Sequence, residues 1–198
     1  IPILINGLRR LEYCGYDSAG LALLDGKRLN SLKKAGKVSE LSNELSVSPI
    51  KGNCGIAHTR WATHGVPNDI NAHPHLDKTG KIALVHNGII ENYDSIKKIL
   101  EKRGVVFTSD TDSEVLVQLI SEIYHNDEDE LDFKDAVKAA LQEVVGAYGI
   151  VAMCSDEPNS LFAARMGSPL VLGVGENEFL FASDASCRYS PPLFLVFF

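Results

Sequence analysis

The residues with the most evident chemical potential lie between His58 and Gly65, in the order His-Thr-Arg-Trp-Ala-Thr-His-Gly. They follow a segment of the sequence that is predicted to form a strand. An arginine binds a carboxylate through two parallel hydrogen bonds, and a threonine hydroxyl can add another. We therefore expect Arg60 and Thr63 to bind the carboxylate of a small ligand. The simpler alternative is a core tryptophan beside a surface arginine.

Two further positions would complete such a site. Asn87-Gly88 follows a predicted strand, and although this dipeptide is common in turns, an amide side chain and a backbone N–H are also the donors of an oxyanion hole. Asp112 falls in the first turn of a predicted helix, where a carboxylate is by default part of the cap. It could instead receive an ammonium group. Together these groups predict a site for a small zwitterion that carries a carbonyl.

The histidines raise the alternative of a metal site. Five of the six histidines lie close together in the sequence, namely His58, His64, His73, His75 and His86. Cys54 could add a soft ligand, but the spacing contains neither HExxH nor paired CxxC motifs. We expect histidines that fix loops by hydrogen bonds, and no metal.

The elements that must position these residues follow from the apolar periodicity. Helices are predicted at Pro2–Leu11, Asn92–Arg103, 111–123 after the capping box Thr111-x-x-Glu114, and Phe133–Val145. Strands are predicted at Ala19–Leu24, Cys54–Thr59, Lys81–His86, Val105–Thr108, Ala147–Cys154, Leu161–Arg165, Leu170–Val174 and Glu178–Ala182. The loop Gly65–Gly80 shows no periodicity, which is typical of a binding loop. Because strands and helices run in separate groups, we expect an α+β fold.

Composition limits the class of protein. The chain has 198 residues, a formal net charge of −7, 45% hydrophobic residues and 23% charged residues. One globular domain is expected. Net acidity without a basic cluster argues against nucleic acid or an anionic membrane as a partner. Four widely spaced cysteines, with no apolar stretch long enough for a membrane span, favour reduced thiols in the cytoplasm.

Five ordered blocks carry a family resemblance. They are Leu11–Gly20, His58–Gly65, Asn71–His75, His86–Asn92 and Ser109–Glu114. They resemble the N-terminal glutaminase domain of the glutamine–fructose-6-phosphate aminotransferases (isomerizing), which are class II glutamine amidotransferases. The resemblance runs from Ile1 to about Asp184. The His58–Gly65 block separates this family from other class II enzymes such as amidophosphoribosyltransferase.

The resemblance implies an N-terminal-nucleophile hydrolase fold, a four-layer αββα sandwich of two antiparallel sheets covered by helices. It also implies a mechanism in which an amino-terminal cysteine attacks the glutamine side-chain amide. The cysteine's own α-amine is the base, and a thioester forms with loss of ammonia. No cofactor is implied. The implied partners are L-glutamine and, through a sugar-isomerase domain outside these residues, fructose 6-phosphate, in a homodimeric full-length enzyme.

The resemblance also assigns roles to residues of this chain. Arg60 and Thr63 would hold the α-carboxylate of glutamine and Asp112 its α-ammonium, while Asn87 and Gly88 would form the oxyanion hole. Trp61 would cover the site and control the passage of ammonia. The two histidines expected to support the adjoining loop are His64 and His73.

Three departures from the family pattern qualify these expectations. The chain starts at Ile1, without the amino-terminal cysteine, and the internal Cys54-Gly55-Ile56 copies the family's opening without its free amine. Cys14 occupies a place where the family usually has arginine. Residues 185–198 resemble an aberrant apolar tail. We therefore expect residues 1–184 to be an amidotransferase domain without its N-terminal strand, which binds glutamine without hydrolysing it.

Two alternatives stay open. One is a non-catalytic glutamine-binding or regulatory domain. The other is the glutaminase domain of a different class II amidotransferase.

Overall fold

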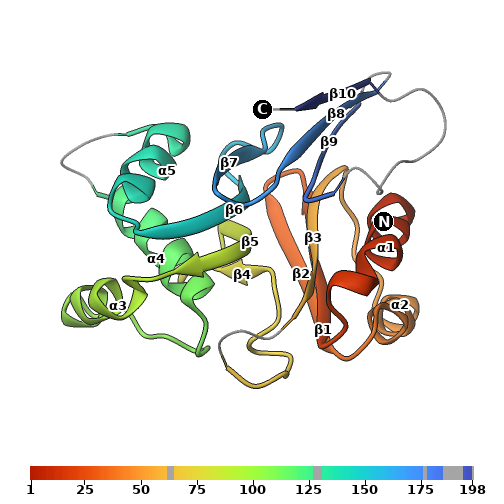
Figure 1. Ribbon diagram of the computed structural model, residues 1–198, viewed down its shortest axis with the longest axis horizontal. Helices are drawn as coiled ribbons and strands as arrows, with labels where there is room; N and C mark the ends of the chain where they lie inside the picture. Colours follow the sequence, from red (N-terminus) through yellow and green to blue (C-terminus); the bar gives the residue numbers. More distant parts are fainter. Residues whose placement is uncertain (62–64, 127–130, 176–177, 185–193, 198) are drawn as a thin grey trace.

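Two facing antiparallel sheets lie between two groups of helices, as the computed structural model shows (Figure 1). The structure describes all residues except 62–64, 127–130, 176–177, 185–193 and 198. The side chains of Cys14 and of Phe194–Phe197 also lie outside the description. The expected order of layers, helix, sheet, sheet, helix, is confirmed. So is the α+β class.

The first sheet has the strand order β2-β1-β3 and is covered by two helices. These elements are α1 (Pro2–Leu11), β1 (Ser18–Asp25), β2 (Arg28–Ala35), α2 (Val38–Val47) and β3 (Cys54–Arg60). A short 3₁₀ helix, η1 (Glu12–Cys14), follows α1. Ile5 and Leu8 of α1 and Leu41 of α2 pack on Leu21 and Leu23 of β1. This apolar face fixes both helices on the sheet.

The second sheet has the order β4-β5-β6-β7 and is covered by three helices. Its elements are β4 (His75–Leu76), β5 (Ile82–Ile90), α3 (Tyr93–Lys102), α4 (Asp112–Tyr124), α5 (Phe133–Gln142), β6 (Gly146–Cys154) and β7 (Phe162–Met166). A separate sheet of order β10-β8-β9 comprises β8 (Val171–Gly175), β9 (Glu178–Ala182) and β10 (Phe194–Phe197). The largest buried side chain under the helices is Phe133, which is fully inaccessible to solvent.

Small and branched side chains fill the layer between the two facing sheets. Ala22 and Leu24 of β1 meet Ala83 and Val85 of β5 there, together with Met153 of β6. Alternate residues of β1 point the other way, toward α1 and α2. β1 is therefore buried on both faces, which explains its continuous apolar run.

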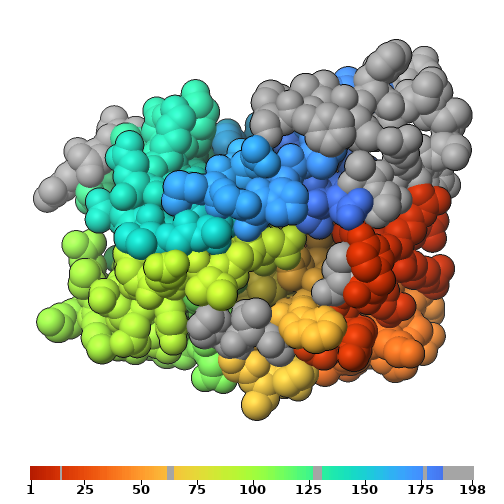
Figure 2. All heavy atoms as spheres, in the orientation of Figure 1, coloured from red at the N-terminus to blue at the C-terminus, as the bar shows by residue number. Residues whose placement is uncertain are grey.

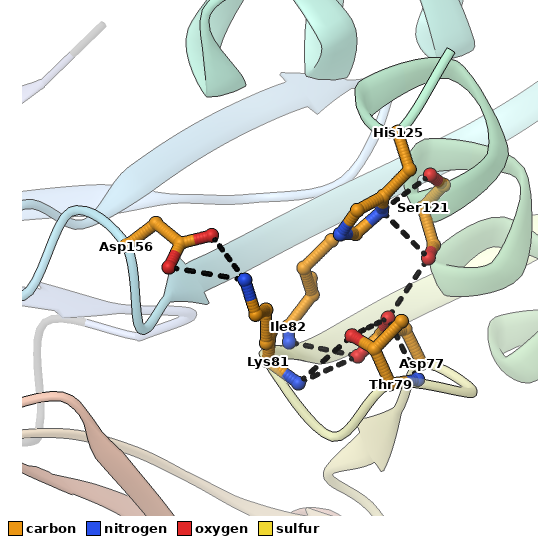
Figure 3. Close-up of polar contacts among 7 residues, drawn as sticks. All are labelled: Asp77, Thr79, Lys81, Ile82, Ser121, His125 and Asp156. Atoms are coloured by element: carbon orange, nitrogen blue, oxygen red, sulfur yellow. Dashed lines mark hydrogen bonds and ion pairs between the residues drawn. The ribbon is translucent and has the colours of Figure 1, made fainter. Parts of the chain in front are cut away.

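A buried carboxylate joins the second sheet to α4 (Figure 3). Asp77 Oδ1 accepts hydrogen bonds from the backbone N–H of Lys81 at 2.9 Å and of Ile82 at 2.8 Å. Asp77 Oδ2 accepts from Ser121 Oγ of α4 at 2.8 Å and from Thr79 N at 3.1 Å. The turn between β4 and β5 is thus built around one side chain and held against the helix.

Several expected boundaries are wrong. β5 does not end at His86 but continues through Asn87-Gly88 to Ile90, because these residues pair with Gly149 and Tyr148 of β6. Residues 105–108 form no strand, and β4 lies within the loop expected to be irregular. The meander expected after residue 147 divides between two sheets.

The ends of the expected domain are partly outside the described residues. Of the apolar tail at 185–198, only Phe194–Phe197 is described, as β10 paired with β8. No helix of the described part is long and apolar enough to cross a membrane.

Candidate active site

A cavity of about 300 Å³ opens between α1, β3, β5, the start of α4 and β9. Figure 2 shows the segments around it on one face, with α1 in red, the end of β3 in gold and the C-terminal strands in blue. Four residues expected to bind the ligand line this cavity, namely Arg60, Asn87, Gly88 and Asp112. They come from three elements, so only the folded chain brings them together.

Arg60 is the last residue of β3 and is 4% exposed. Its Nη2 donates a long hydrogen bond to Gly65 O at 3.5 Å. Burial lowers the pKa of the guanidinium, and the carboxylates of Asp17 and Asp112 oppose this shift. An arginine stays protonated even so, and the site therefore contains a buried cation.

Asp112 begins α4 directly after the N-cap residue Thr111. Its Oδ2 accepts a hydrogen bond from the backbone N–H of Ile90 at 2.9 Å, which ties the helix start to β5. The helix N-terminus favours a carboxylate here. Among the described residues, Asp112 Oδ1 has one long contact, of 3.5 Å with Ser113 Oγ, so this oxygen can accept a hydrogen bond from a ligand ammonium.

Asn87 and Gly88 are exposed residues within β5 and line the same cavity. Gly88 has φ +136°, a conformation that side chains rarely adopt, and a Cβ there would lie 2.0 Å from Ala147 O. Only glycine fits this backbone. In the neighbouring residue, Asn87 Oδ1 lies 2.8 Å from His58 Nε2. These consecutive residues contain an amide donor and a backbone N–H, the two groups expected of an oxyanion hole.

Buried histidines and hydroxyls form the floor of the site. His73 Nε2 and His86 Nδ1 each lie 2.9 Å from Ser113 Oγ, and His75 Nε2 lies 2.9 Å from Thr111 Oγ1. Burial lowers the pKa of His73 and His75 well below the usual range, and the neighbouring charges of the other histidines and Arg60 add to this effect. The rings of His73 and His75 are therefore neutral at pH 7.

The outcome for the remaining expected residues is mixed. Trp61 lines the cavity with 59% of its surface exposed, and its ring meets Tyr16 edge to face at 5.6 Å. His73 precedes β4 and lines the cavity, where its Nε2 lies 2.9 Å from Ser113 Oγ of α4. Thr63 and His64 lie outside the described residues.

The cysteines that the structure describes do not supply a reactive thiol. Burial raises the pKa of both Cys54 and Cys154, which disfavours the thiolate. Neither residue lines the cavity among the described side chains. The described residues also contain no group of three or more side chains placed to hold a metal ion.

Sequence reasoning missed two contributors to the site, His58 and Ser113. Ser113 follows Asp112 in the first turn of α4 and contacts two histidines at once. His58 is expected from the sequence only to fix a loop by hydrogen bonds, whereas its contact with Asn87 crosses from one sheet to the other. The position of His58 two residues before Arg60 on the same strand was the available signal, because alternate residues share a face.

Comparison with known proteins decides the family. Residues 58–188, which include Arg60, Asn87, Gly88 and Asp112, match the glutamine amidotransferase domain family. This chain belongs to that family.

Curated relatives extend the match over most of this amidotransferase domain. Glutamine–fructose-6-phosphate aminotransferases (isomerizing) are 56% identical in Chlorobaculum tepidum and 55% identical in Bacteroides thetaiotaomicron. The alignments cover 93% of this chain but 30% of each relative. The chain thus spans about 30% of the length of these relatives.

Solved structures confirm the fold of the amidotransferase domain. A glutamine phosphoribosylpyrophosphate amidotransferase from B. subtilis superimposes with a TM-score of 0.80 at 28% identity. A structure described as the allosteric regulatory enzyme of purine biosynthesis gives 0.81 at 29%. Both matches cover 94% of this chain and 40% of the other, and both proteins have the expected N-terminal-nucleophile hydrolase fold.

Proposed function

We propose that this amidotransferase domain binds L-glutamine as the glutaminase half of a glutamine–fructose-6-phosphate aminotransferase. Three features of glutamine correspond to three groups in the cavity. Arg60 binds the α-carboxylate, Asp112 binds the α-ammonium, and Asn87 with Gly88 binds the side-chain carbonyl.

One observation carries this proposal. A buried cation, a buried carboxylate and a pair of neutral donors line one cavity of about 300 Å³. Charged groups that line a cavity favour a ligand with matching opposite charges. A zwitterion with an uncharged carbonyl fits this arrangement.

The reaction follows from the family resemblance. An amino-terminal cysteine thiol attacks the amide carbon of glutamine and gives its proton to the α-amine. The tetrahedral oxyanion is held by Asn87 Nδ2 and Gly88 N–H, after which ammonia leaves with a proton and a thioester remains. Water then releases glutamate and restores the thiol.

The names of the relatives support a fuller assignment. We propose that the ammonia is transferred to fructose 6-phosphate on a separate sugar-isomerase domain, yielding glucosamine 6-phosphate. Trp61, at the exposed rim, would cover the passage. A homodimeric, cytoplasmic enzyme is the accompanying proposal from the resemblance and the cysteine pattern.

Calorimetric titration of the chain with L-glutamine tests the binding proposal. We expect saturable binding to one site, and loss of at least about tenfold in affinity for Arg60→Ala, since a charged hydrogen bond contributes about 1.5–3 kcal/mol. Asp112→Asn should weaken binding similarly.

Two controls sharpen that titration. Arg165 is an exposed arginine of β7 outside the cavity lining, so Arg165→Ala should leave glutamine affinity unchanged. D-Glutamine, which exchanges the positions of the ammonium and the side chain, should bind much more weakly. Unchanged affinity of Arg60→Ala would remove the carboxylate assignment.

A further inference from the structure

We propose that His58 is a positioning residue for the oxyanion hole, and that it holds the side-chain amide of Asn87 in the one orientation that presents its donor to the ligand. The inference rests on the proposed function and deepens it. It adds a residue whose role neither the family match nor the relatives assign.

The contact links the two halves of the site. His58 lies on β3, two residues before Arg60, and Asn87 lies on β5 in the facing sheet. Their side chains approach to 2.8 Å, from His58 Nε2 to Asn87 Oδ1. The strand that holds the proposed carboxylate clamp thereby touches the strand that holds the proposed carbonyl donors.

The orientation of an asparagine amide decides its chemistry. Its oxygen only accepts and its nitrogen only donates, so a rotation of the amide by half a turn exchanges the two. With Oδ1 bound by His58, Nδ2 is left for the cavity. In the reversed orientation Oδ1 would face the ligand carbonyl, and it would repel the negative charge that develops there.

The same contact requires a particular tautomer of His58. Oδ1 has no proton, so Nε2 must carry the shared one. Burial lowers the pKa of His58 to about 4; the nearby positive charges of His86 and Arg60 act in the same direction, while the Asn87 hydrogen bond opposes them. The ring of His73, which is also buried and neutral, stacks beside His58 at 4.3 Å. His58 is therefore a neutral donor at pH 7.

The hydroxyl contacts of the other floor histidines do not fix a tautomer. His73, His75 and His86 contact the hydroxyls of Ser113 and Thr111. A hydroxyl can donate or accept by rotating, so either tautomer satisfies such a contact. The side-chain hydrogen bond of His58, by contrast, is made to a proposed ligand-binding group, Asn87.

Two ligands separate this role from a merely structural one. L-Glutamine uses all three groups of the site, whereas L-norvaline keeps the α-carboxylate and α-ammonium but has no side-chain carbonyl. We expect His58→Leu to weaken glutamine binding about three- to tenfold, as expected for one neutral hydrogen bond, and to leave norvaline binding unchanged.

Two amide variants provide the matched control. Glutamine can place an NH₂ group near the position of Nε2, whereas the shorter asparagine places it near Nδ1. His58→Gln should therefore restore glutamine affinity to within about twofold of the original chain, and His58→Asn should not. Equal losses for both ligands, or no difference between the Gln and Leu variants, would overturn the proposal.

A ligand-free measurement decides the contact independently. In ¹H–¹⁵N spectra of the histidine rings at pH 7, we expect the His58 proton on Nε2. A proton on Nδ1 would overturn the positioning role even if glutamine binds. Failure of both ligands to bind would instead contradict the proposed function. The tautomer measurement would still show whether His58 donates to Asn87, because it needs no ligand.

Discussion

At the residue scale, Gly88 connects backbone geometry to ligand recognition. It has φ +136°, and any Cβ would meet Ala147 O of the paired strand at 2.0 Å. The carbonyl of Ala147 belongs to a sheet and cannot move away without breaking the ladder. The proposed oxyanion hole therefore depends on the absence of a side chain.

We predict that Gly88→Ala destabilises the fold by about 1–3 kcal/mol and removes the recognition of the glutamine carbonyl. Gly80→Ala is the control, since Gly80 also has positive φ, +71°, but nothing lies within 4 Å of its Cβ position. Urea unfolding and calorimetry should show strain in both variants and loss of glutamine affinity only in Gly88→Ala. A normal affinity of Gly88→Ala would contradict the assignment.

The histidine floor predicts a pH dependence of stability. The pKa of His58 falls from the ordinary value near 6.5 to about 4 on folding, and those of His73 and His75 fall as well. Between the pKa values of the unfolded and folded states, the unfolded chain binds protons that the folded chain does not bind. The contribution of these histidines to the free energy of unfolding is therefore fully present above about pH 6.5, and it decreases as the pH is lowered through this window.

Each such histidine contributes a slope of up to about 1.4 kcal/mol per pH unit. We expect His58→Gln to flatten the decrease in unfolding free energy between pH 6.5 and 4.5 by up to this amount, because one titrating group is removed. Unfolding in urea at several pH values measures both slopes. Equal slopes of unfolding free energy against pH for the two proteins would show that folding does not shift the pKa of His58.

The sequence predicted residues that line the cavity but not the side chains that support them. Arg60, Asp112 and Asn87-Gly88 were recognisable because their chemistry is unusual for their predicted positions. His58 was not, because its partner lies on a strand of the other sheet. No local pattern encodes a contact across two layers.

At the element scale, α4 is the helix that positions the site. Its N-terminal turn presents Thr111, Asp112 and Ser113 to the histidines and β5. Further along, Gln118 accepts from Lys78 N at 3.1 Å, and Ser121 donates to Asp77. The helix is thus attached to the second sheet along its length.

Asp77→Ala should test this attachment. The substitution leaves several buried donors without their acceptor, so we expect a loss of about 3 kcal/mol or more in unfolding free energy. Asp156→Ala removes only an exposed ion pair with Lys81 and should cost less than about 1 kcal/mol. Equal effects in chemical unfolding would contradict the structural role of Asp77.

Element boundaries could be predicted where local signals were strong. Thr111 caps α4 as expected and accepts from Glu114 N, although Glu114 binds the backbone of Thr108 and Ser109 rather than that of Thr111. β2 and α2 were missed, since β2 is a polar, half-buried edge strand. The turn signal of Asn87-Gly88 was overridden by pairing with β6.

At the scale of the whole molecule, the distance between the two facing sheets determines whether the site forms. Arg60 belongs to one sheet, and Asn87 and Gly88 belong to the other. Alanines such as Ala22 and Ala83 fill the layer between them and are fully buried. Small side chains there permit the close approach of the two sheets that the His58–Asn87 hydrogen bond requires.

Enlarging one of these alanines should separate the halves of the site. We predict that Ala83→Leu costs about 1–3 kcal/mol in stability and weakens glutamine binding, since the added volume cannot be accommodated in a packed layer. Ala139→Leu, at a partly exposed position of α5, is the control and should change neither by much. Normal glutamine binding by a folded Ala83→Leu protein would show that the spacing is not critical.

The most direct test of the glutamine-binding site is a crystal structure of the chain with L-glutamine bound. We predict that the α-carboxylate lies on Arg60, the α-ammonium on Asp112, and the side-chain carbonyl oxygen within hydrogen-bonding distance of Asn87 Nδ2 and Gly88 N. Glutamine bound outside the cavity, or with its carboxylate at Asn87 and Gly88, would contradict this account.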